Sequence, residues 1–290
     1  IYNHLSNINT KKATSNDSYP SWITRNNAHL LAQPITHIVN EILSNSYFPA
    51  LWKQSQITPI NKVKTPHVYK DMRPIALTFH LGKITERVIS DLIKSDLPKM
   101  KNQYAYTKEL STTDALVKFS SDISAGLDKT DTVTLQALLL DFSKAFDRMR
   151  PDIAVSKLLS LNVSPSLVKV TMSFLTNRQQ QVKSQGKLSK LKPSRIGVPQ
   201  GTILGPLLWN VFVNDLDPNT NHIKYADDTT LYNTVRLGDV EISDSTAHRA
   251  TISFTQNPLQ EAASYAAAWC DSNEMLLNTT KSMCISFTLQ

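Results

Sequence analysis

The stretch HIKYADDTTLY, residues 222–232, places two adjacent aspartates between short runs in which apolar or aromatic residues alternate with polar ones. Alternation with a period of two is typical of strands, so the stretch predicts a β-hairpin with Asp227 and Asp228 at its turn. A turn alone can account for the pair, because aspartate tolerates turn geometry and is well solvated there. A functional interpretation requires further carboxylates that converge on this turn.

A further carboxylate, Asp141, ends the stretch TVTLQALLLD, residues 132–141. This stretch first alternates and then runs continuously from Leu138 to Leu140, as in a strand buried on both faces. A carboxylate at the end of such a run is costly unless a partner or a metal stabilises it, although a turn or a helix cap is the commoner role. Asp147, six residues later, fits a turn that enters a helix at Pro151.

A loop rich in glycine and proline, GVPQGTILGP, spans residues 197–206 and contains three of the chain's seven glycines. That density indicates backbone in unusual conformations or in close contact with a ligand. A tight surface loop is the alternative, but the apolar run ILGPLLWNVFV continues directly as a predicted helix. Upstream, Arg73 stands before Pro74 in KDMRPIALT; its guanidinium suits a phosphate, whereas a lone arginine more often forms a surface ion pair.

Apolar periodicity predicts the remaining elements and an α+β fold, a sheet with helices on one side. The predicted helices span residues 28–47, 80–98, 111–128, 152–161, 166–176, 203–216 and 258–272. Further strands or hairpins are predicted within residues 48–64, 178–197 and 282–289. Residues 1–27 are rich in Asn, Ser, Thr and Lys, and are predicted to be a loose lead-in.

Composition narrows the class of protein. The 290 residues are 41% hydrophobic, and no apolar run is long enough to cross a bilayer or to form a signal peptide. Cys270 and Cys284 are the only cysteines, which excludes a disulfide framework and a cysteine-based zinc site. The formal net charge of +7 favours a polyanionic partner. We therefore expect an intracellular protein without a membrane partner.

The order of these features resembles that of the reverse transcriptases, most closely the non-LTR (LINE-type) retrotransposons of jockey-like kind. The blocks that carry the resemblance are RPIALT, STTDAL, LLLDFSKAFDRMRPD, GVPQGTILGPLLWNVFVNDL, YADD and LNTTKS. They extend from about residue 28 to the end. The resemblance implies a right-hand polymerase fold with an antiparallel palm sheet backed by helices. Fingers would span residues 28–132, and the palm with interleaved finger segments residues 133–290, with the thumb absent.

The implied activity is that of an RNA-directed DNA polymerase within a retrotransposon polyprotein, which adds dNTPs to a primer 3′-hydroxyl by two-metal phosphoryl transfer. Asp141 and Asp227 would bind two Mg²⁺ ions, for which Mn²⁺ could substitute, with Asp228 beside them. Two hard cations about 3.5–4 Å apart can stabilise both the attacking and the leaving oxygens. Phe142 would lend a backbone carbonyl to a metal.

The resemblance also implies roles around the nucleotide. Lys62 and Arg73 would grip the triphosphate, and Gln200 and Gly201 would shape the nucleotide and template pocket. The remaining candidates are Phe146, at the position that excludes a 2′-hydroxyl, and Lys281, as general acid for pyrophosphate. In QYAYTKE, Ala105 stands where many relatives have glycine, a change expected to alter a turn and not the chemistry.

The expected partners are an RNA template, a DNA primer and dNTPs, in a ribonucleoprotein of the nucleus and cytoplasm, while the oligomeric state stays open. One alternative is a catalytically inactive nucleic-acid-binding remnant of a decayed element; the retained carboxylates, Gln200, Arg73 and Lys281 favour intact chemistry. A cellular or group II intron-type reverse transcriptase is a second alternative. A metal-dependent nuclease would not need the Gly-Pro-Gln-Gly loop or the Arg-Pro block.

Overall fold

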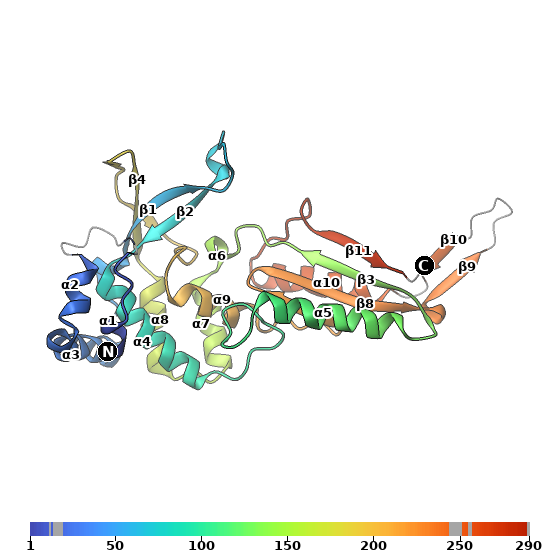
Figure 1. The fold of residues 1–290 in the computed structure, drawn as a ribbon, viewed down its shortest axis with the longest axis horizontal. Coiled ribbons are helices and arrows are strands. Elements are labelled where there is room, and N and C mark those ends of the chain that lie inside the picture. Colours follow the sequence, from blue (N-terminus) through green and yellow to red (C-terminus); the bar gives the residue numbers. More distant parts are fainter. Residues whose placement is uncertain (12, 14–19, 244–250, 255–256, 289–290) are drawn as a thin grey trace. The chain divides into compact units, whose positions relative to one another are not determined.

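The computed structural model in Figure 1 describes residues 1–11, 13, 20–243, 251–254 and 257–288. Its contacts divide the chain into two compact units. Unit 1 consists of Ile1–Lys99 and Phe146–Phe212, and unit 2 consists of Met100–Ala145 and Val213–Gln290. The chain thus crosses between the units three times, and each unit is built from two separate segments.

Unit 1 contains most of the helices, and their apolar stripes form its core. Its first two helices lie in the segment predicted as a loose lead-in, where Leu5 and Ile8 are buried against Ile35, Val39 and Ile84. The helices are α1 (Tyr2–Ser6), α2 (Ser21–Asn26), α3 (Ala28–Ser44), α4 (His80–Asp96), α7 (Pro151–Ser160), α8 (Pro165–Leu175) and α9 (Leu204–Val213), with α6 (Ala145–Arg148) at the boundary between the units.

A five-stranded sheet completes unit 1. Its strands are β1 (Gln54–Asn61), β2 (Met72–Leu77), β4 (Arg178–Ser184), β5 (Lys187–Leu188) and β6 (Lys192–Ser194). The order is β2-β1-β4-β5, and β6 also pairs with β4. β1 and β2 form an antiparallel hairpin, whereas β1 and β4 run parallel. The hairpin predicted within residues 178–197 is confirmed, because β4 pairs antiparallel with both β5 and β6.

Unit 2 is built on a four-stranded sheet in which every pairing is antiparallel, with the order β11-β3-β8-β7. The strands are β3 (Thr132–Leu140), β7 (Asn221–Tyr225), β8 (Asp228–Arg236) and β11 (Met283–Phe287). Two helices cover it, α5 (Thr112–Leu127) and α10 (Pro258–Ser272). A separate antiparallel pair joins β9 (Val240–Ser243) and β10 (Thr251–Phe254).

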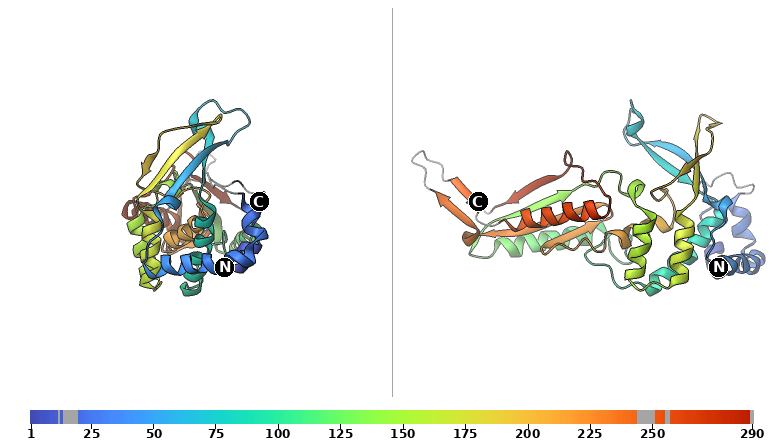
Figure 2. Two further views of the ribbon diagram at one scale, coloured as in Figure 1. Left: turned by 90° about the vertical axis from the view of Figure 1, so that its left-hand side faces the viewer. Right: turned by 180° about the vertical axis from the view of Figure 1, so that it is seen from behind.

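The two helices of unit 2 lie on opposite faces of its sheet. α5 lies in front of the sheet in Figure 1 and behind it in the reverse view of Figure 2, whereas α10 does the opposite. Leu135 and Ala137 of β3 pack in one core cluster with side chains of α5, while β3 also contacts α10. The prediction of helices on one side is therefore wrong, because the continuous leucines of β3 are covered from both faces.

The start of α5 shows how local sequence sets an element's boundary. Ser111 is the N-cap, and its side chain accepts a hydrogen bond from the Asp114 amide while the Asp114 carboxylate accepts one from the Ser111 amide. This reciprocal capping box satisfies donors that the first helical turn leaves unpaired. Across the part of the chain that the structure describes, no helix combines the length and the apolar character needed to cross a membrane.

Candidate active site

Three aspartates meet at one end of the unit 2 sheet. The last pair between β3 and β8 is Leu140 with Thr229, so Asp141 and Asp228 are the next residues beyond this pair. Tyr225 pairs with Asp228 across the β7–β8 hairpin, which leaves Ala226 and Asp227 as its two turn residues. Burial, and then the charges of Asp227 and Asp141, raise the pKa of Asp228 above its usual value. The predicted convergence of carboxylates on the hairpin turn is therefore present.

A pocket of about 680 Å³ opens beside these carboxylates. Asp141, Asp228 and the predicted general acid Lys281 all line it, whereas Asp227 is not among its lining residues. The pocket is formed by the ends of β3 and β8 and by the segment that enters β11, residues 280–283. The structure thus brings Lys281 to Asp141 from a position 140 residues away in the sequence.

Asp141 is held by the segment just before β11. The Asn278 side chain donates a hydrogen bond of 2.8 Å to Asp141 Oδ2, and the Asn278 amide donates one of 2.7 Å to the Asp141 carbonyl. The Asp141 amide donates in turn to Ser282 Oγ, at 3.2 Å. Phe142 is buried, with its ring edge-on to Trp269 at 6.0 Å between centroids. Asn278 and Ser282 were not predicted as functional residues, although both belong to the block LNTTKS.

The turn that carries Asp227 is strained. Ala226 has a φ of +56°, in the left-handed region. This conformation costs an L-residue roughly 1–2 kcal/mol, because the side chain approaches a carbonyl oxygen too closely. A two-residue hairpin turn needs a positive φ, and glycine or asparagine usually supplies it. An alanine there requires support from the surrounding structure.

Two carboxylates at this end of the sheet are suited in their chemistry to a hard divalent cation. Asp141 and Asp228 offer carboxylate oxygens, the ligands that Mg²⁺ prefers. Burial, and then repulsion from Asp227 and Asp141, raise the pKa of Asp228, and a cation beside these carboxylates would favour the ionised form. Within the described ranges, no group of three or more His, Cys, Asp or Glu side chains has an arrangement that could hold a metal ion. The charge of Asp227 acts on Asp228, although these side chains do not form such a group in the described residues.

The other predicted residues lie in unit 1, around the β1–β2 hairpin and the Gly-Pro-Gln-Gly loop. Lys62 directly follows β1 and is exposed, and Arg73 lies in β2, paired with Ile60 and also exposed. The loop joins the same hairpin, because the Ala76 amide of β2 donates a 2.7 Å hydrogen bond to the Gln200 carbonyl. Unit 1 therefore connects the backbone of Gln200 to the strand that carries Arg73.

Close backbone packing accounts for two of the three glycines of this loop. Gly197 has a φ of +83°, and a Cβ built there would lie 2.5 Å from the Asp147 carbonyl oxygen. Gly201 has a φ of +106°, and its Cβ would lie 3.1 Å from the Ala76 carbonyl oxygen. An L-residue with a side chain would be strained at both positions. The prediction of unusual conformations in the loop is confirmed; the close contacts are with backbone of the same unit.

The loop is fastened to the segment that contains Phe146. The Val198 amide donates to the Phe146 carbonyl at 2.8 Å, and Gln200 Nε2 donates to Asp147 Oδ1 at 3.3 Å. The Phe146 ring is half-buried and lies 5.3 Å from the Trp209 ring, tilted by 38°. Asp147, interpreted from the sequence as a turn residue, thus lies in α6 and holds the Gln200 side chain.

A buried glutamate anchors the far end of the loop. Glu86 of α4 accepts hydrogen bonds from the amides of Ile203 and Leu204, at 2.6 and 3.1 Å, where α9 begins. Burial raises the pKa of Glu86, opposed by the Leu204 amide and then by the charge of the buried Arg178. Sequence reasoning missed Glu86; the available signal was a carboxylate at helical spacing from the apolar residues Ile89 and Ile93, with which it shares the buried face of α4.

Replacing Glu86 with leucine is expected to destabilise the chain by about 1–3 kcal/mol, because the amides of Ile203 and Leu204 lose their buried acceptor. Urea denaturation measures the free energy of unfolding. Glu86→Gln is the matched control, since it keeps an acceptor oxygen of similar reach and should lose less. A leucine variant as stable as the unsubstituted chain would show that Glu86 does not anchor the loop.

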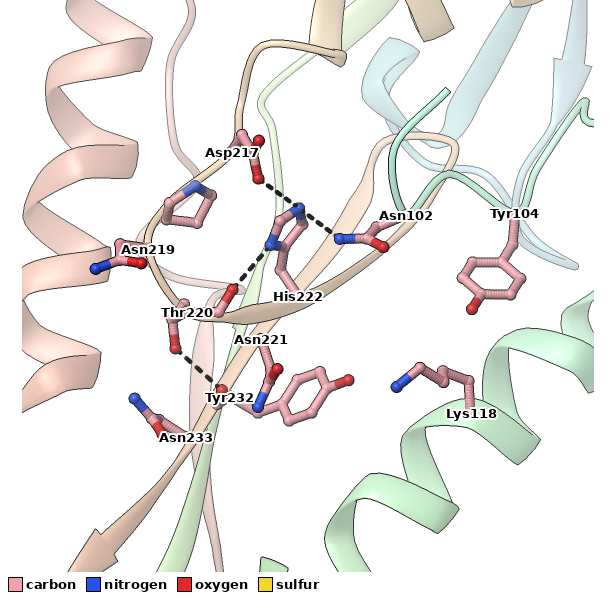
Figure 3. A pocket seen from close by; sticks show the side chains of 11 residues that line it. Asn102, Tyr104, Lys118, Asp217, Asn219, Thr220, Asn221, His222, Tyr232 and Asn233 are labelled. Carbon is pink, nitrogen blue, oxygen red and sulfur yellow. Dashed lines mark hydrogen bonds and ion pairs between the residues drawn. The ribbon is translucent and has the colours of Figure 1, made fainter. Parts of the chain in front are cut away.

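A second pocket in unit 2, of about 470 Å³, has a polar lining (Figure 3). His222 lines this pocket and is itself buried. Its Nδ1 lies 3.0 Å from the Thr220 carbonyl oxygen, and its Nε2 lies 3.1 Å from the side-chain nitrogen of Asn102. Tyr104, Lys118 of α5, the loop before β7, and Tyr232 and Asn233 of β8 also line it. None of the predicted site residues lines this pocket.

Comparison with known proteins agrees with this geometry. The sequence model of the family "Reverse transcriptase (RNA-dependent DNA polymerase)" matches residues 60–286. The "Probable RNA-directed DNA polymerase from transposon BS" of Drosophila melanogaster is 30% identical over 285 residues, which cover 91% of this chain and 30% of that protein. The "RNA-directed DNA polymerase from mobile element jockey" of the same species is 29% identical over 274 residues, covering 93% and 30%. The chain thus spans about a third of the length of these relatives.

The fold is that of a right-hand polymerase. The telomerase of Candida tropicalis, truncated from its C-terminal domain, aligns with a TM-score of 0.55 at 11% identity, covering 90% of this chain and 56% of that one. The telomerase of Candida albicans aligns with a TM-score of 0.53 at 12% identity, covering 88% and 46%. The resemblance to jockey-like retrotransposons is confirmed by the sequence matches. The chain belongs to the reverse transcriptase family.

Proposed function

We propose that this chain acts as the RNA-directed DNA polymerase of a non-LTR retrotransposon polyprotein and adds dNTPs to a primer 3′-hydroxyl. The observation that carries the proposal is the meeting of Asp141, Asp227 and Asp228 at one end of the unit 2 sheet, in a chain of the reverse transcriptase family. In-line phosphoryl transfer is mostly positioning and charge neutralisation. The carboxylate end of this sheet supplies the groups that such a reaction needs.

The carboxylates would hold two Mg²⁺ ions, with Mn²⁺ as a substitute, and the Phe142 carbonyl would be a further ligand. Bound ions would stabilise the attacking and leaving oxygens of the displacement. Asn278 donates a hydrogen bond to the Asp141 carboxylate, and the Asp141 amide donates one to Ser282; these bonds hold Asp141 in place and support this role. Lys281 lines the same pocket as Asp141, which supports its role as the proton donor to the leaving pyrophosphate.

The proposed nucleotide contacts belong to unit 1. Lys62 and Arg73 would bind the triphosphate, since both are exposed cations on the β1–β2 hairpin. Gln200 and Gly201 would contact the nucleotide and template, and Phe146 would contact the sugar. In the terms of the polymerase hand, residues 28–132 would form the fingers and residues 133–290 the palm with interleaved finger segments.

The partners follow from the same reaction. An RNA template and a DNA primer are polyanions, which suits the net charge of +7. The Candida albicans telomerase, similar in fold, was solved in complex with a fragment of telomeric RNA. We place the protein in a ribonucleoprotein that occupies the nucleus and the cytoplasm.

Primer extension tests the proposal. The chain is incubated with an RNA template, an annealed DNA primer, dNTPs and Mg²⁺, and the products are resolved at single-nucleotide length. We expect additions that follow the template sequence, stop when the cation is chelated, and resume when Mg²⁺ or Mn²⁺ is restored. RNA binding without extension under either cation would favour the inactive remnant of a decayed element.

A further inference from the structure

The segment that contains Gln103 runs along the outer edge of β7. The Lys224 amide donates a 2.8 Å hydrogen bond to the Asn102 carbonyl, and the Tyr104 amide donates a 2.9 Å bond to the Lys224 carbonyl. Gln103 and Lys224 thereby form a parallel β-bridge. The bridge holds Gln103 beside the strand that leads into the turn with the paired aspartates.

The Gln103 side chain contacts both backbone polar groups of Ala226. Gln103 is only 2% exposed. Its Oε1 accepts hydrogen bonds from the amides of Ala226, at 3.1 Å, and of Ala105, at 3.0 Å. Its Nε2 donates to the Ala226 carbonyl, at 3.5 Å. The buried Gln103 carboxamide thus hydrogen-bonds to both the amide and the carbonyl of Ala226, the residue whose φ of +56° strains the turn.

The chemistry of glutamine suits this position. A carboxamide offers an acceptor and a donor on one rigid group, which is what the amide and carbonyl of one residue require. A carboxylate would accept but not donate, and it would add a negative charge close to Asp227. An apolar side chain would leave the Ala226 carbonyl and the amides of Ala226 and Ala105 without this partner.

We propose that Gln103 is a positioning residue for nucleotide addition. It holds Ala226 in the left-handed conformation and so fixes the directions in which Asp227 and Asp228 leave the turn. As a statement about the reaction, the inference rests on the proposed function; as a statement about the turn, it rests on the contacts alone. The side-chain hydrogen bonds of Gln103 go to the backbone of Ala226 and Ala105, so Gln103 acts on the aspartates through the backbone of the turn.

A double-substitution experiment separates positioning from simple packing. Gln103→Met keeps the length of the side chain and removes its hydrogen bonds. Ala226→Gly removes the cost of the left-handed conformation, because glycine adopts it freely. The turn of the Ala226→Gly variant therefore depends less on Gln103. Gln103→Asn, which keeps the carboxamide on a stem one methylene shorter, is a second and milder variant if the methionine variant does not fold.

Two readouts are measured on each variant: hydrogen exchange of the Ala226 amide, and kcat and KM for a dNTP in primer extension. In Gln103→Met, we expect hydrogen exchange of the Ala226 amide to rise at least about tenfold and kcat to fall about tenfold, with KM changing less than about threefold. With Ala226→Gly present, the kcat loss caused by Gln103→Met should shrink below about threefold.

The outcomes are distinct. A loss of kcat that is equal in both backgrounds, or one that appears in KM, would overturn the positioning role and leave Gln103 as a packing residue. Unchanged exchange of the Ala226 amide in Gln103→Met would overturn the inference as a whole. If the unsubstituted chain extends no primer, the proposed function fails, and the exchange comparison still decides whether Gln103 holds the turn.

Discussion

Replacing Asp141 or Asp227 with asparagine is expected to abolish nucleotide addition, with a rate loss of roughly 10²–10³-fold or more. Each change removes a negative oxygen from the carboxylate end of the unit 2 sheet while keeping the size of the side chain. RNA binding should change little, because lysines and arginines supply most of the non-specific affinity of a basic protein. Asp228→Asn is expected to cause a large loss as well, since Asp228 lines the same pocket as Asp141.

Single-turnover primer extension and equilibrium RNA binding, measured on the same preparations, check this prediction. Asp131→Asn is the matched control, because Asp131 is an exposed aspartate of unit 2 whose partner is Arg236, at 3.7 Å. An Asp141→Asn or Asp227→Asn variant that extends primers at the rate of the control would refute the assignment of the catalytic carboxylates.

Shortening Phe146 to valine or alanine is expected to raise ribonucleotide incorporation markedly while dNTP addition continues at a reduced rate. The ring is half-buried against Trp209, so it is held on one side by a large and fully buried neighbour. A ring fixed in this way cannot move aside for a 2′-hydroxyl, and a steric clash in a packed site discriminates more strongly than a missing contact does.

The measurement is the ratio of kcat/KM for a dNTP and the matching rNTP on one template. Phe212→Leu is the control, because Phe212 is a fully buried aromatic residue that stacks on Trp209 at 6.0 Å and has no proposed contact with substrate. That control loses core packing as Phe146→Ala does, but its ratio of kcat/KM for dNTP and rNTP should equal that of the unsubstituted chain. An unchanged ratio in a folded and active Phe146→Ala variant would mean that Phe146 is a core residue and that another group selects the sugar.

The elements that sequence predicted well are those whose cause is local. The strand before Asp141 and the hairpin around Asp227 follow from alternation, and both stand where they were expected. The start of α5 follows from the Ser111 cap, which acts over three residues. Such patterns depend on a few residues that are close together in the sequence, so a single sequence suffices to recognise them.

The supports of the site could not be predicted in this way. Glu86 caps α9 across 117 residues, and Gln103 reaches Ala226 across 123. A buried polar side chain needs a hydrogen-bond partner, but only the fold reveals which partner it has. The helices on both faces of the unit 2 sheet are a similar case. The leucines of β3 indicate that the strand is buried on both faces, but they do not show which helices pack there.

The attachment of the Gly-Pro-Gln-Gly loop to the Phe146 segment bears on how such domains can be recombined. Two stretches about fifty residues apart share the contacts of Gly197 with the Asp147 backbone, of Val198 with Phe146, and of Gln200 with Asp147. The two stretches therefore form one packed unit, although they are separate in the sequence. A chimera that imports the Phe146 segment from a relative without the matching loop would join surfaces shaped for other partners. If Phe146 selects the sugar as proposed, we expect that selectivity to transfer between relatives only when both segments are exchanged together.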